Sequence, residues 1–268
     1  METPPSAKFS ETSITSGALV LFGAPGPGYL SSLVVSNFHH ALKAEGFVPS
    51  FVPCPSAPAR VKVKGGGELI LPGIRLSVAR GASRSFGGKP RDLVLARSNF
   101  RGSDASERGL AGREIAGFLE KMAPAHVFVV DGEYERGVGK VRGVTRVCNE
   151  LAAKQLGVRA TEPSLEGIVG VEELPGAVFR ACTERGLPAT AFVSSVSGGN
   201  LEEELARLAS LRLVRALSLR VVKSFNFDHL EARARTLRER VEAWTRQAAE
   251  LAREATEANH GAKPDYYS

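Results

Sequence analysis

The feature that most constrains the fold is an alternation of apolar, strand-like runs with helix-like stretches along most of the chain. The clearest strand-like runs are residues 18–22, 92–97, 126–131 and 189–194. Nearly continuous apolar runs of this length are typical of strands buried in a parallel sheet. Because strand–helix–strand crossovers are right-handed, helices then cover both faces of the sheet. The sequence therefore predicts a three-layer α/β/α fold with a mostly parallel sheet.

The remaining helices and strands are predicted from the spacing of their apolar residues and from the Gly and Pro residues that end them. Apolar residues at helical spacing predict helices over 29–44, 109–122, 142–156, 175–185 and 200–216. Further strands are expected over 47–52 and 165–171. Alternating apolar and charged residues over 60–79, around three glycines at 65–67, predict a hairpin or meander.

A long helix over about 228–257 is the clearest single element. Asp228 and Glu231 have the spacing of a capping box at its start. A narrow apolar stripe with alternating spacings of 4 and 3 then follows: Leu230, Ala234, Leu237, Val241, Trp244, Ala248, Leu251 and Ala255. Such a stripe suits packing on the chain's own domain or on a partner, and both readings stay open.

The length of 268 residues fits one α/β domain with appendages. Residues 1–16 are polar, rich in Ser and Thr, and lack the apolar core of a signal peptide, so we expect a flexible N-terminal tail. We expect a single domain over 17–258, with the long helix included. Residues 259–268 contain His, Gly and Pro and are expected to form a flexible C-terminal tail.

The net charge of +6 is unevenly spread. Between residues 60 and 91 one acidic residue, Glu68, stands against eight basic ones: Arg60, Lys62, Lys64, Arg75, Arg80, Arg84, Lys89 and Arg91. Such a region attracts acidic partners. Because Phe86 is its one aromatic residue, stacking platforms for bases are scarce, and a solvated basic face is the favoured interpretation. RNA binding is a lesser alternative, which would show steep salt dependence.

The three cysteines are scattered at positions 54, 148 and 182. Their odd number and the lack of a CxxC spacing favour reduced thiols in a cytoplasmic protein over disulfides or a zinc site. We expect Cys148 and Cys182 to be core residues on helices. No apolar run reaches membrane-spanning length, so we expect no membrane association. The expected location is the cytoplasm, with the nucleus as a second compartment.

A glycine- and proline-rich turn follows the first strand and contains Gly23, Pro25, Gly26 and Gly28. The spacing differs from the dinucleotide fingerprint, and the second strand ends in Pro-Cys-Pro instead of an acidic residue. The turn also lacks the Gly-Lys-Ser/Thr ending of a P-loop. We interpret it as a tight structural turn.

Carboxylates at 131, 133 and 135 follow the central strand, at the edge where open α/β sheets bind ligands. No His lies near them in the sequence, and His126, at the start of the strand, is interpreted as structural. We find no catalytic constellation, no metal site and no cofactor motif. The alternative hypothesis is an enzyme acting on nucleosides or phosphate esters, with an anion at the Gly23–Gly28 turn and Asp131 with Glu133 at the sheet edge.

The chain ends in Tyr266-Tyr267-Ser268, which places two of its four tyrosines in the last three residues. Termini have little need of aromatic residues unless they bind something. A ring, a hydroxyl and a free carboxylate on a loose tether suit capture in another protein's pocket.

The order of these motifs resembles the proteasome assembly chaperone 2 family over about residues 18–222. The resemblance rests on the strand, Gly-x-x-Gly-x-Gly turn and helix over 22–30, and on Asp92-Leu-Val-Leu-Ala followed by a helix and Val127-Phe-Val-Val-Asp-Gly. It continues with the glycines at 167 and 170, then Leu174-Pro-Gly-Ala-Val and Gly186-Leu-Pro. The terminal tripeptide is similar to the hydrophobic-Tyr-X motif by which such chaperones dock between proteasome α-subunits.

This resemblance implies a chaperone without enzymatic activity. It implies a heterodimer with a chaperone-1-like sister subunit that binds proteasome α-subunits and promotes α-ring assembly. Tyr267 would supply the key ring, Tyr266 the hydrophobic position and Ser268 the carboxylate. The long helix and the basic region at 60–91 have no counterpart in the family pattern.

Overall fold

The computed structural model describes most of the chain. The described residues are 17–57, 60–62, 68–83, 90–135, 144–157, 173–197, 202–222, 225 and 228–261. Internal contacts divide the chain into two compact units, Met1–Asn226 and Phe227–Ser268. We call the first unit the α/β body and describe the second by itself.

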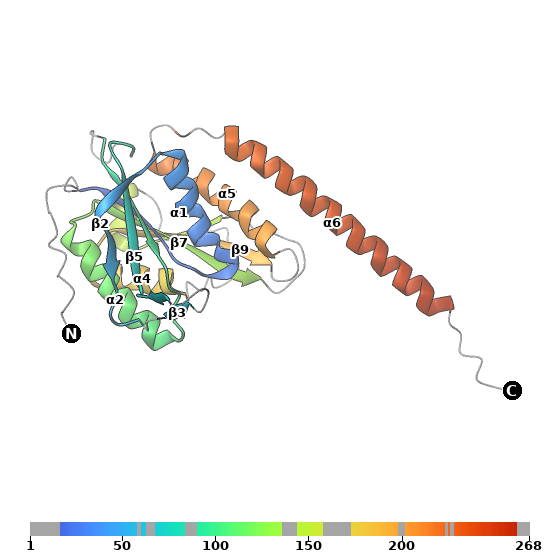
Figure 1. The fold of residues 1–268 in the computed structure, drawn as a ribbon. Coiled ribbons are helices and arrows are strands. Elements are labelled where there is room, and N and C mark those ends of the chain that lie inside the picture. The colour runs from blue at the N-terminus through green and yellow to red at the C-terminus, as the bar shows by residue number, and fades with distance from the viewer. Residues whose placement is uncertain are drawn as a thin grey trace. The chain divides into compact units, whose positions relative to one another are not determined.

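The α/β body is built on a seven-stranded sheet with the order β2-β5-β6-β1-β7-β9-β8 (Figure 1). Its strands are β1 (Leu19–Gly23), β2 (Glu45–Pro53), β5 (Gly73–Ala79), β6 (Leu93–Ser98), β7 (His126–Glu135), β8 (Val144–Cys148) and β9 (Ala189–Ser197). The four central strands β6, β1, β7 and β9 are parallel. The outer strands β5, β2 and β8 pair antiparallel. The parallel pairing expected from the sequence is thus confined to the centre of a mixed sheet.

Helices cover both faces, which confirms the three-layer α/β fold. The helices of the body are α1 (Leu30–Ala41), α2 (Ala105–Lys121), α3 (Glu150–Leu156), α4 (Leu174–Glu184) and α5 (Glu202–Val221). Helices α1 and α5 lie on one face, whereas α2 and α4 lie on the other (Figure 1). All five residues of β1 are buried, as expected for the central strand of such a sheet.

Successive residues of β1 point to opposite faces of the sheet. Val20 and Phe22 belong to the core cluster that includes Ile115 and Leu119 of α2 and Val178 of α4. The shared cluster shows that both helices pack their apolar stripes on the same side of β1. The body therefore has a continuous core that spans several elements far apart in the sequence.

The hairpin expected around the glycines at 65–67 is confirmed. Strands β3 (Arg60–Lys62) and β4 (Glu68–Ile70) pair antiparallel as a separate two-stranded sheet. Strand β5 follows directly and joins the main sheet between β2 and β6. The strand expected over 165–171 lies outside the described residues.

The helix expected over 142–156 is wrong in its first half. Residues Val144–Cys148 form the edge strand β8, which pairs antiparallel with β9. Helix α3 begins only after Asn149, whose side chain accepts a hydrogen bond from the Ala152 backbone N–H. Cys148 is therefore a buried strand residue, not a helix residue, whereas Cys182 lies buried on α4 as expected.

The second unit contains helix α6 (Asp228–Gly261), which has 34 residues. It begins at the residue expected from the capping box. It extends past the expected end at about residue 257, so residues 259–261 are helical and not part of a tail without regular structure.

Candidate functional site

The residues expected to dock into a partner, Tyr266, Tyr267 and Ser268, lie outside the described residues, which end at Gly261. The remaining candidates lie in the α/β body and on α6. The geometry of each shows what it can do chemically.

The turn after β1 allows helix α1 to pack closely against the strand. Gly23 ends β1, Pro25 and Gly26 follow, and Gly28 lies in a short 3-10 helix, Pro27–Tyr29, before α1. A Cβ atom on Gly23 would lie 2.7 Å from the Ser31 carbonyl oxygen and 2.8 Å from Val35 Cγ2. Glycine at position 23 thus lets the first turn of α1 approach the strand more closely than any side chain would allow.

Ser31 ties this turn to the neighbouring strand β7. Its hydroxyl donates a hydrogen bond of 2.6 Å to the Val130 carbonyl and accepts one of 3.1 Å from the Ala24 N–H. Ser31 is only 2% exposed, so the hydroxyl is fully used inside the protein. The Ser31 bonds fix the position of α1 relative to the middle of β7.

The carboxyl ends of β1 and β7 form a topological switch point of the sheet, because α1 follows β1 on one face whereas α4, in the crossover from β7 to β9, lies on the other. A Cβ atom on Gly132 would lie 3.2 Å from Leu30 Cδ2 and 3.5 Å from Pro27 Cβ. Both Pro27 and Leu30 are buried. The chain's own side chains therefore occupy the place where an open α/β sheet would hold a phosphate.

The carboxylate of Asp131 is also engaged inside the protein. Asp131 is 2% exposed, and its Oδ1 accepts a hydrogen bond of 2.8 Å from the Gly132 N–H. Glu133 and Glu135 follow on the same strand, opposite Ser195 and Ser197 of β9, and their side chains lie outside the described set. Among the side chains described, no group of three His, Cys, Asp or Glu could hold a metal ion.

His126, at the start of β7, is structural, as its position in the sequence indicated. Its ring nitrogens lie 2.9 Å from Gln155 Oε1 and 2.9 Å from Thr190 Oγ1. The ring stacks on Phe128 with centroids 4.4 Å apart. Burial lowers the pKa of His126 to about 4, so the ring is neutral at physiological pH.

The three cysteines are free and buried. Burial raises the pKa of both the Cys54 and the Cys182 thiol to about 12. Cys54 Sγ also donates a hydrogen bond of 3.1 Å to Glu114 Oε2. Because the thiolate is the reactive form, neither thiol is a nucleophile at neutral pH.

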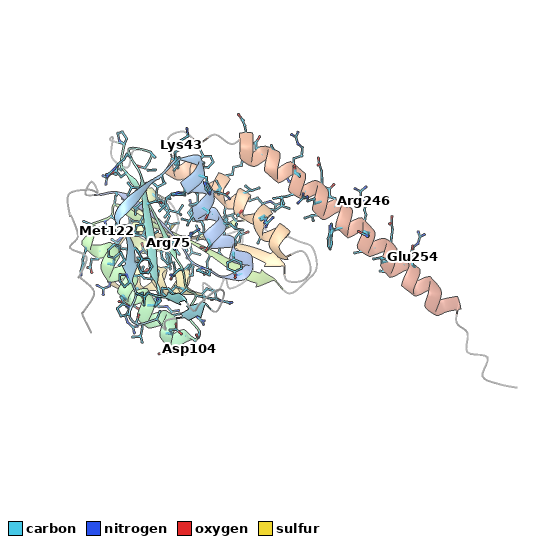
Figure 2. The ribbon with its side chains drawn as sticks, viewed as in Figure 1. Lys43, Arg75, Asp104, Met122, Arg246 and Glu254 are labelled. Atoms are coloured by element: carbon cyan, nitrogen blue, oxygen red, sulfur yellow. The ribbon has the colours of Figure 1, made fainter. Side chains whose placement is uncertain are left out.

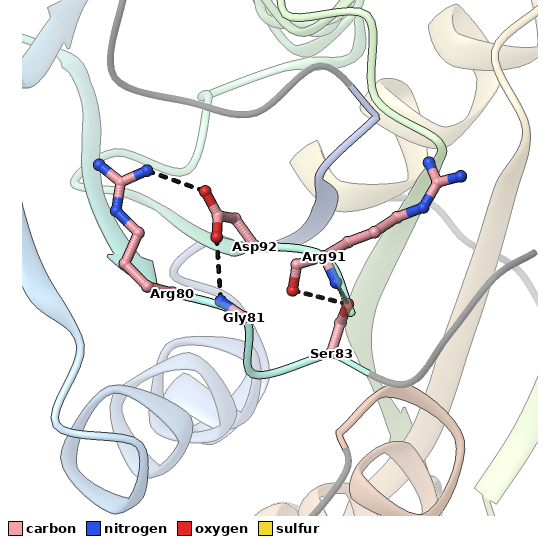
Figure 3. Close-up of polar contacts among 5 residues, drawn as sticks. All are labelled: Arg80, Gly81, Ser83, Arg91 and Asp92. Atoms are coloured by element: carbon pink, nitrogen blue, oxygen red, sulfur yellow. Dashed lines mark hydrogen bonds and ion pairs between the residues drawn. The ribbon is translucent and has the colours of Figure 1, made fainter. Parts of the chain in front are cut away.

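Two cations of the basic region are used to hold the structure, and Figure 3 shows the contacts of one of them, Arg80, with Asp92. Arg80 pairs with Asp92 at 2.8 Å, and the second Asp92 oxygen accepts from the Gly81 N–H at 2.9 Å. Ser83 Oγ donates to the Arg91 carbonyl at 2.8 Å, and the Arg91 guanidinium donates to the Gly17 carbonyl at 2.7 Å. Asp92 lies one residue past the counted window, so the local charge excess is smaller than the sequence count indicated.

One basic groove, of about 580 Å³, lies where α1 crosses the antiparallel part of the sheet. The Arg97 guanidinium donates a hydrogen bond of 2.9 Å to Ser36 Oγ, and His39 Nδ1 lies 3.0 Å from Ser77 Oγ. Burial, and then the neighbouring charges of His40 and Arg97, lower the pKa of His39. The groove is lined by Val35, Ser36, His39, His40, Phe51, Arg75, Leu76, Ser77, Leu95 and Arg97. The groove carries the side chains of Arg75 and Arg97, and sequence reasoning missed it because the lining comes from four separate elements.

Helix α6 leaves large apolar side chains exposed, as the body does at Tyr29 and Leu71. Trp244 is 55% exposed and Leu251 is 58% exposed. Charged side chains such as Arg246 and Glu254 project from other positions of the helix (Figure 2). No helix among the described residues is long and apolar enough to cross a membrane.

These features define a class of protein: a three-layer α/β body whose sheet edge is closed by its own side chains, followed by a long amphipathic helix. The sequence pattern of the PAC2 family matches residues 20–245. The chain therefore belongs to the PAC2 family. No curated protein matches the chain.

Solved structures share the fold. PbaB of Pyrococcus furiosus, an archaeal proteasome activator, superposes with a TM-score of 0.63 at 14% identity over 87% of this chain and 95% of PbaB. A proteasome-assembly chaperone homologue of Mycobacterium tuberculosis gives 0.53 at 20% identity, over 87% and 94% of the two chains. A PAC2 family protein of Streptomyces avermitilis gives 0.54 at 22% identity, over 84% and 95%.

Proposed function

We propose that this chain is a proteasome assembly chaperone subunit that binds α-subunits of the proteasome core particle and promotes assembly of the α-ring. The observation that carries the proposal is the match to the PAC2 family over residues 20–245. The names of two structural neighbours, a proteasome activator and a proteasome-assembly chaperone homologue, support the same role.

The docking element of this proposal is the C-terminal tripeptide. Tyr267 fills a pocket between two α-subunits, and the Ser268 carboxylate pairs with a lysine of that pocket. Tyr266 supports the docking as the hydrophobic residue of the motif. A ring and a carboxylate at the end of a free tether match a known mode of peptide capture.

The α/β body supplies the second contact. We expect it to pair with a related chaperone-1-like subunit, and the basic groove around His39 and Arg97 suits an acidic segment of a partner. Each tail contact is weak by itself. Body and tail together bind tightly, because the second contact forms at high effective concentration.

The role is that of a binding protein and not of an enzyme. Three described groups that a catalyst could use are engaged elsewhere: Cys54 is protonated, His126 is buried and neutral, and Asp131 bonds to its neighbour's backbone. Pro27 and Leu30 pack at the switch point, next to Gly132. The described part of this site gives the hypothesis of a nucleoside or phosphate-ester enzyme no support, and the side chain of its other carboxylate, Glu133, lies outside the described residues.

Replacing Tyr267 by Ala tests the proposal. We expect the Y267A chain, with a free C-terminus, to bind a purified α-subunit ring at least roughly tenfold more weakly, since buried tyrosines are common hot spots of binding. Y266F is the matched control, because it keeps an apolar ring at the neighbouring position and should retain binding. The measurement is equilibrium binding by surface plasmon resonance.

The melting temperature of Y267A should equal that of the unchanged chain. Unchanged ring binding by Y267A would contradict the docking role. A fall in melting temperature that accounts for the lost binding would contradict it as well.

A further inference from the structure

Within the second unit nothing described covers the apolar stripe of α6, because α6 is the one element of that unit among the described residues. On this stripe Trp244 and Leu251 are more than half exposed. Val241 and Ala248 continue the stripe between them at the 3–4 spacing of a coiled-coil seam. The exposed half of the stripe, residues 241–251, is therefore an apolar surface that a partner helix would cover.

We propose that this half of α6 pairs antiparallel with the same helix of a second copy of the chain, about a two-fold axis near residue 246. In this register Trp244 faces Ala248 of the second copy, and Val241 faces Leu251 of the second copy. The two-fold axis repeats each layer. Every layer then joins a larger side chain with a smaller one, which is the condition for close packing between helices.

The charges beside the stripe fit the same register. Arg240 and Glu254 occupy equivalent flanking positions, each one residue before a stripe residue, and both are exposed. Antiparallel pairing brings these flanking positions together, so Arg240 meets Glu254 of the second copy, and the symmetry gives two such pairs. Gln247 meets Gln247 of the second copy between them, and no like charges meet on this side.

Parallel pairing of two copies fits less well. It would put Trp244 in the same layer as Trp244 of the second copy and Ala248 in the same layer as its own counterpart. One layer would be overfilled and the next underfilled. Parallel pairing would also separate Arg240 from Glu254 by 14 residues, or roughly 21 Å along the helix.

This inference does not rest on the proposed function, because it uses only α6 and a second copy of the chain. The pairing is isologous, so the same residues contribute from both copies. Trp244 is the only tryptophan of the chain, and its fluorescence therefore reports the environment of the seam.

A charge exchange on the full-length protein tests the pairing. R240E and E254R each replace two attractive contacts by two repulsive ones, and we expect each to weaken dimerisation about tenfold. The double variant R240E/E254R restores opposite charges across the two-fold axis and should dimerise like the unchanged chain. R246E, on the face away from the stripe, is the matched control and should leave dimerisation unchanged.

Sedimentation equilibrium measures the dimer dissociation constant, and the blue shift of Trp244 emission with concentration gives a second readout. Far-UV circular dichroism checks that each variant keeps the helix. Restored dimerisation in the double variant would support the antiparallel register, because a folding defect would not be repaired by a second charge change. A chain that stays monomeric, or a double variant as weak as the single ones, would overturn the proposal.

Discussion

The α/β body and helix α6 are organised differently: the body is a layered fold with a shared core, whereas α6 is a single helix and the one element of its unit among the described residues. In the body, side chains such as Leu30 and Leu119 are fully buried. On α6, Trp244 and Leu251 remain exposed although the helix has 34 residues. The body therefore has a core of its own, whereas the described part of the second unit has none, and its apolar stripe would need other apolar surface to cover it.

Polar groups of the body are bound across elements that lie far apart in the sequence. In the body, Ser31, His126 and Glu173 are each bound to specific partners, and Arg101 binds Glu173 through two bonds of 2.9 and 2.6 Å. The hydrogen bonds from Arg101 lower the pKa of Glu173. These bonds lock the loop after β6 to the start of α4. The body is thus built as a fixed scaffold, on which binding surfaces can be held.

The distinction between the two regions predicts that replacing a leucine by alanine lowers the free energy of unfolding much more in the body than on α6. L119A should lower the free energy of unfolding of the body by about 2–5 kcal/mol, because it leaves a cavity in the core. L251A, at a position that is 58% exposed, should change the free energy of unfolding by less than about 0.5 kcal/mol at protein concentrations where the chain is monomeric. Denaturant unfolding followed by far-UV circular dichroism measures both, and equal losses would contradict the distinction.

The buried ring of His126 predicts a pH dependence that belongs to the body alone. Its pKa is about 4 in the folded state against an ordinary value of 6.5, so the unfolded chain takes up a proton first as the pH falls. Stability should therefore fall by about 3 kcal/mol between pH 6.5 and 4, with no loss from this group above pH 6.5.

H126N should remove that part of the pH slope, whatever its effect on stability at pH 7. H40N changes an exposed ring on α1 and is the matched control, which should keep the slope. Urea unfolding at a series of pH values gives the measurement. An unchanged slope in H126N would show that the ring is protonated in the folded protein.

A smaller effect tests how closely α1 approaches the sheet. G23A would bring a Cβ atom 2.7 Å from the Ser31 carbonyl oxygen, which belongs to the backbone and cannot turn away. We expect a loss of about 2 kcal/mol from overpacking. At Gly26 nothing lies within 4 Å of a built Cβ, so G26A is the matched control and should cost less than about 0.5 kcal/mol. Thermal unfolding of the two variants separates the prediction from a general glycine effect.

Much of the body could be predicted from the sequence because its strands are strong apolar runs. β1 and β7 were found by their composition, and the sheet centre is parallel as expected. The edge strand β8 was not predicted. Because Val144–Cys148 is short and lies directly before a helix, the spacing of apolar residues alone assigned it to the same helix as α3. The cap at Asn149 was the signal that could have separated the two.

The start of α2 illustrates the same limit. The sequence prediction began at residue 109, whereas α2 begins at Ala105. Asp104 accepts a hydrogen bond from the Glu107 N–H, and the Glu107 side chain accepts one from the Ser103 N–H. This capping arrangement is readable in the sequence, as it was at Asp228 in α6. The basic groove and the filled switch point could not be predicted, because they depend on strand order and on contacts between distant segments.

The most direct test of the central claim is a pull-down from an extract of the source cell with an N-terminal tag, which leaves the terminal carboxylate free. The full-length chain is compared with a chain that ends at Asp265, and bound proteins are identified by mass spectrometry. The account predicts recovery of proteasome α-subunits and a sister chaperone with the full-length chain. It also predicts that truncation reduces the α-subunits. Recovery of neither, or equal recovery of α-subunits by both chains, would contradict docking through Tyr266-Tyr267-Ser268.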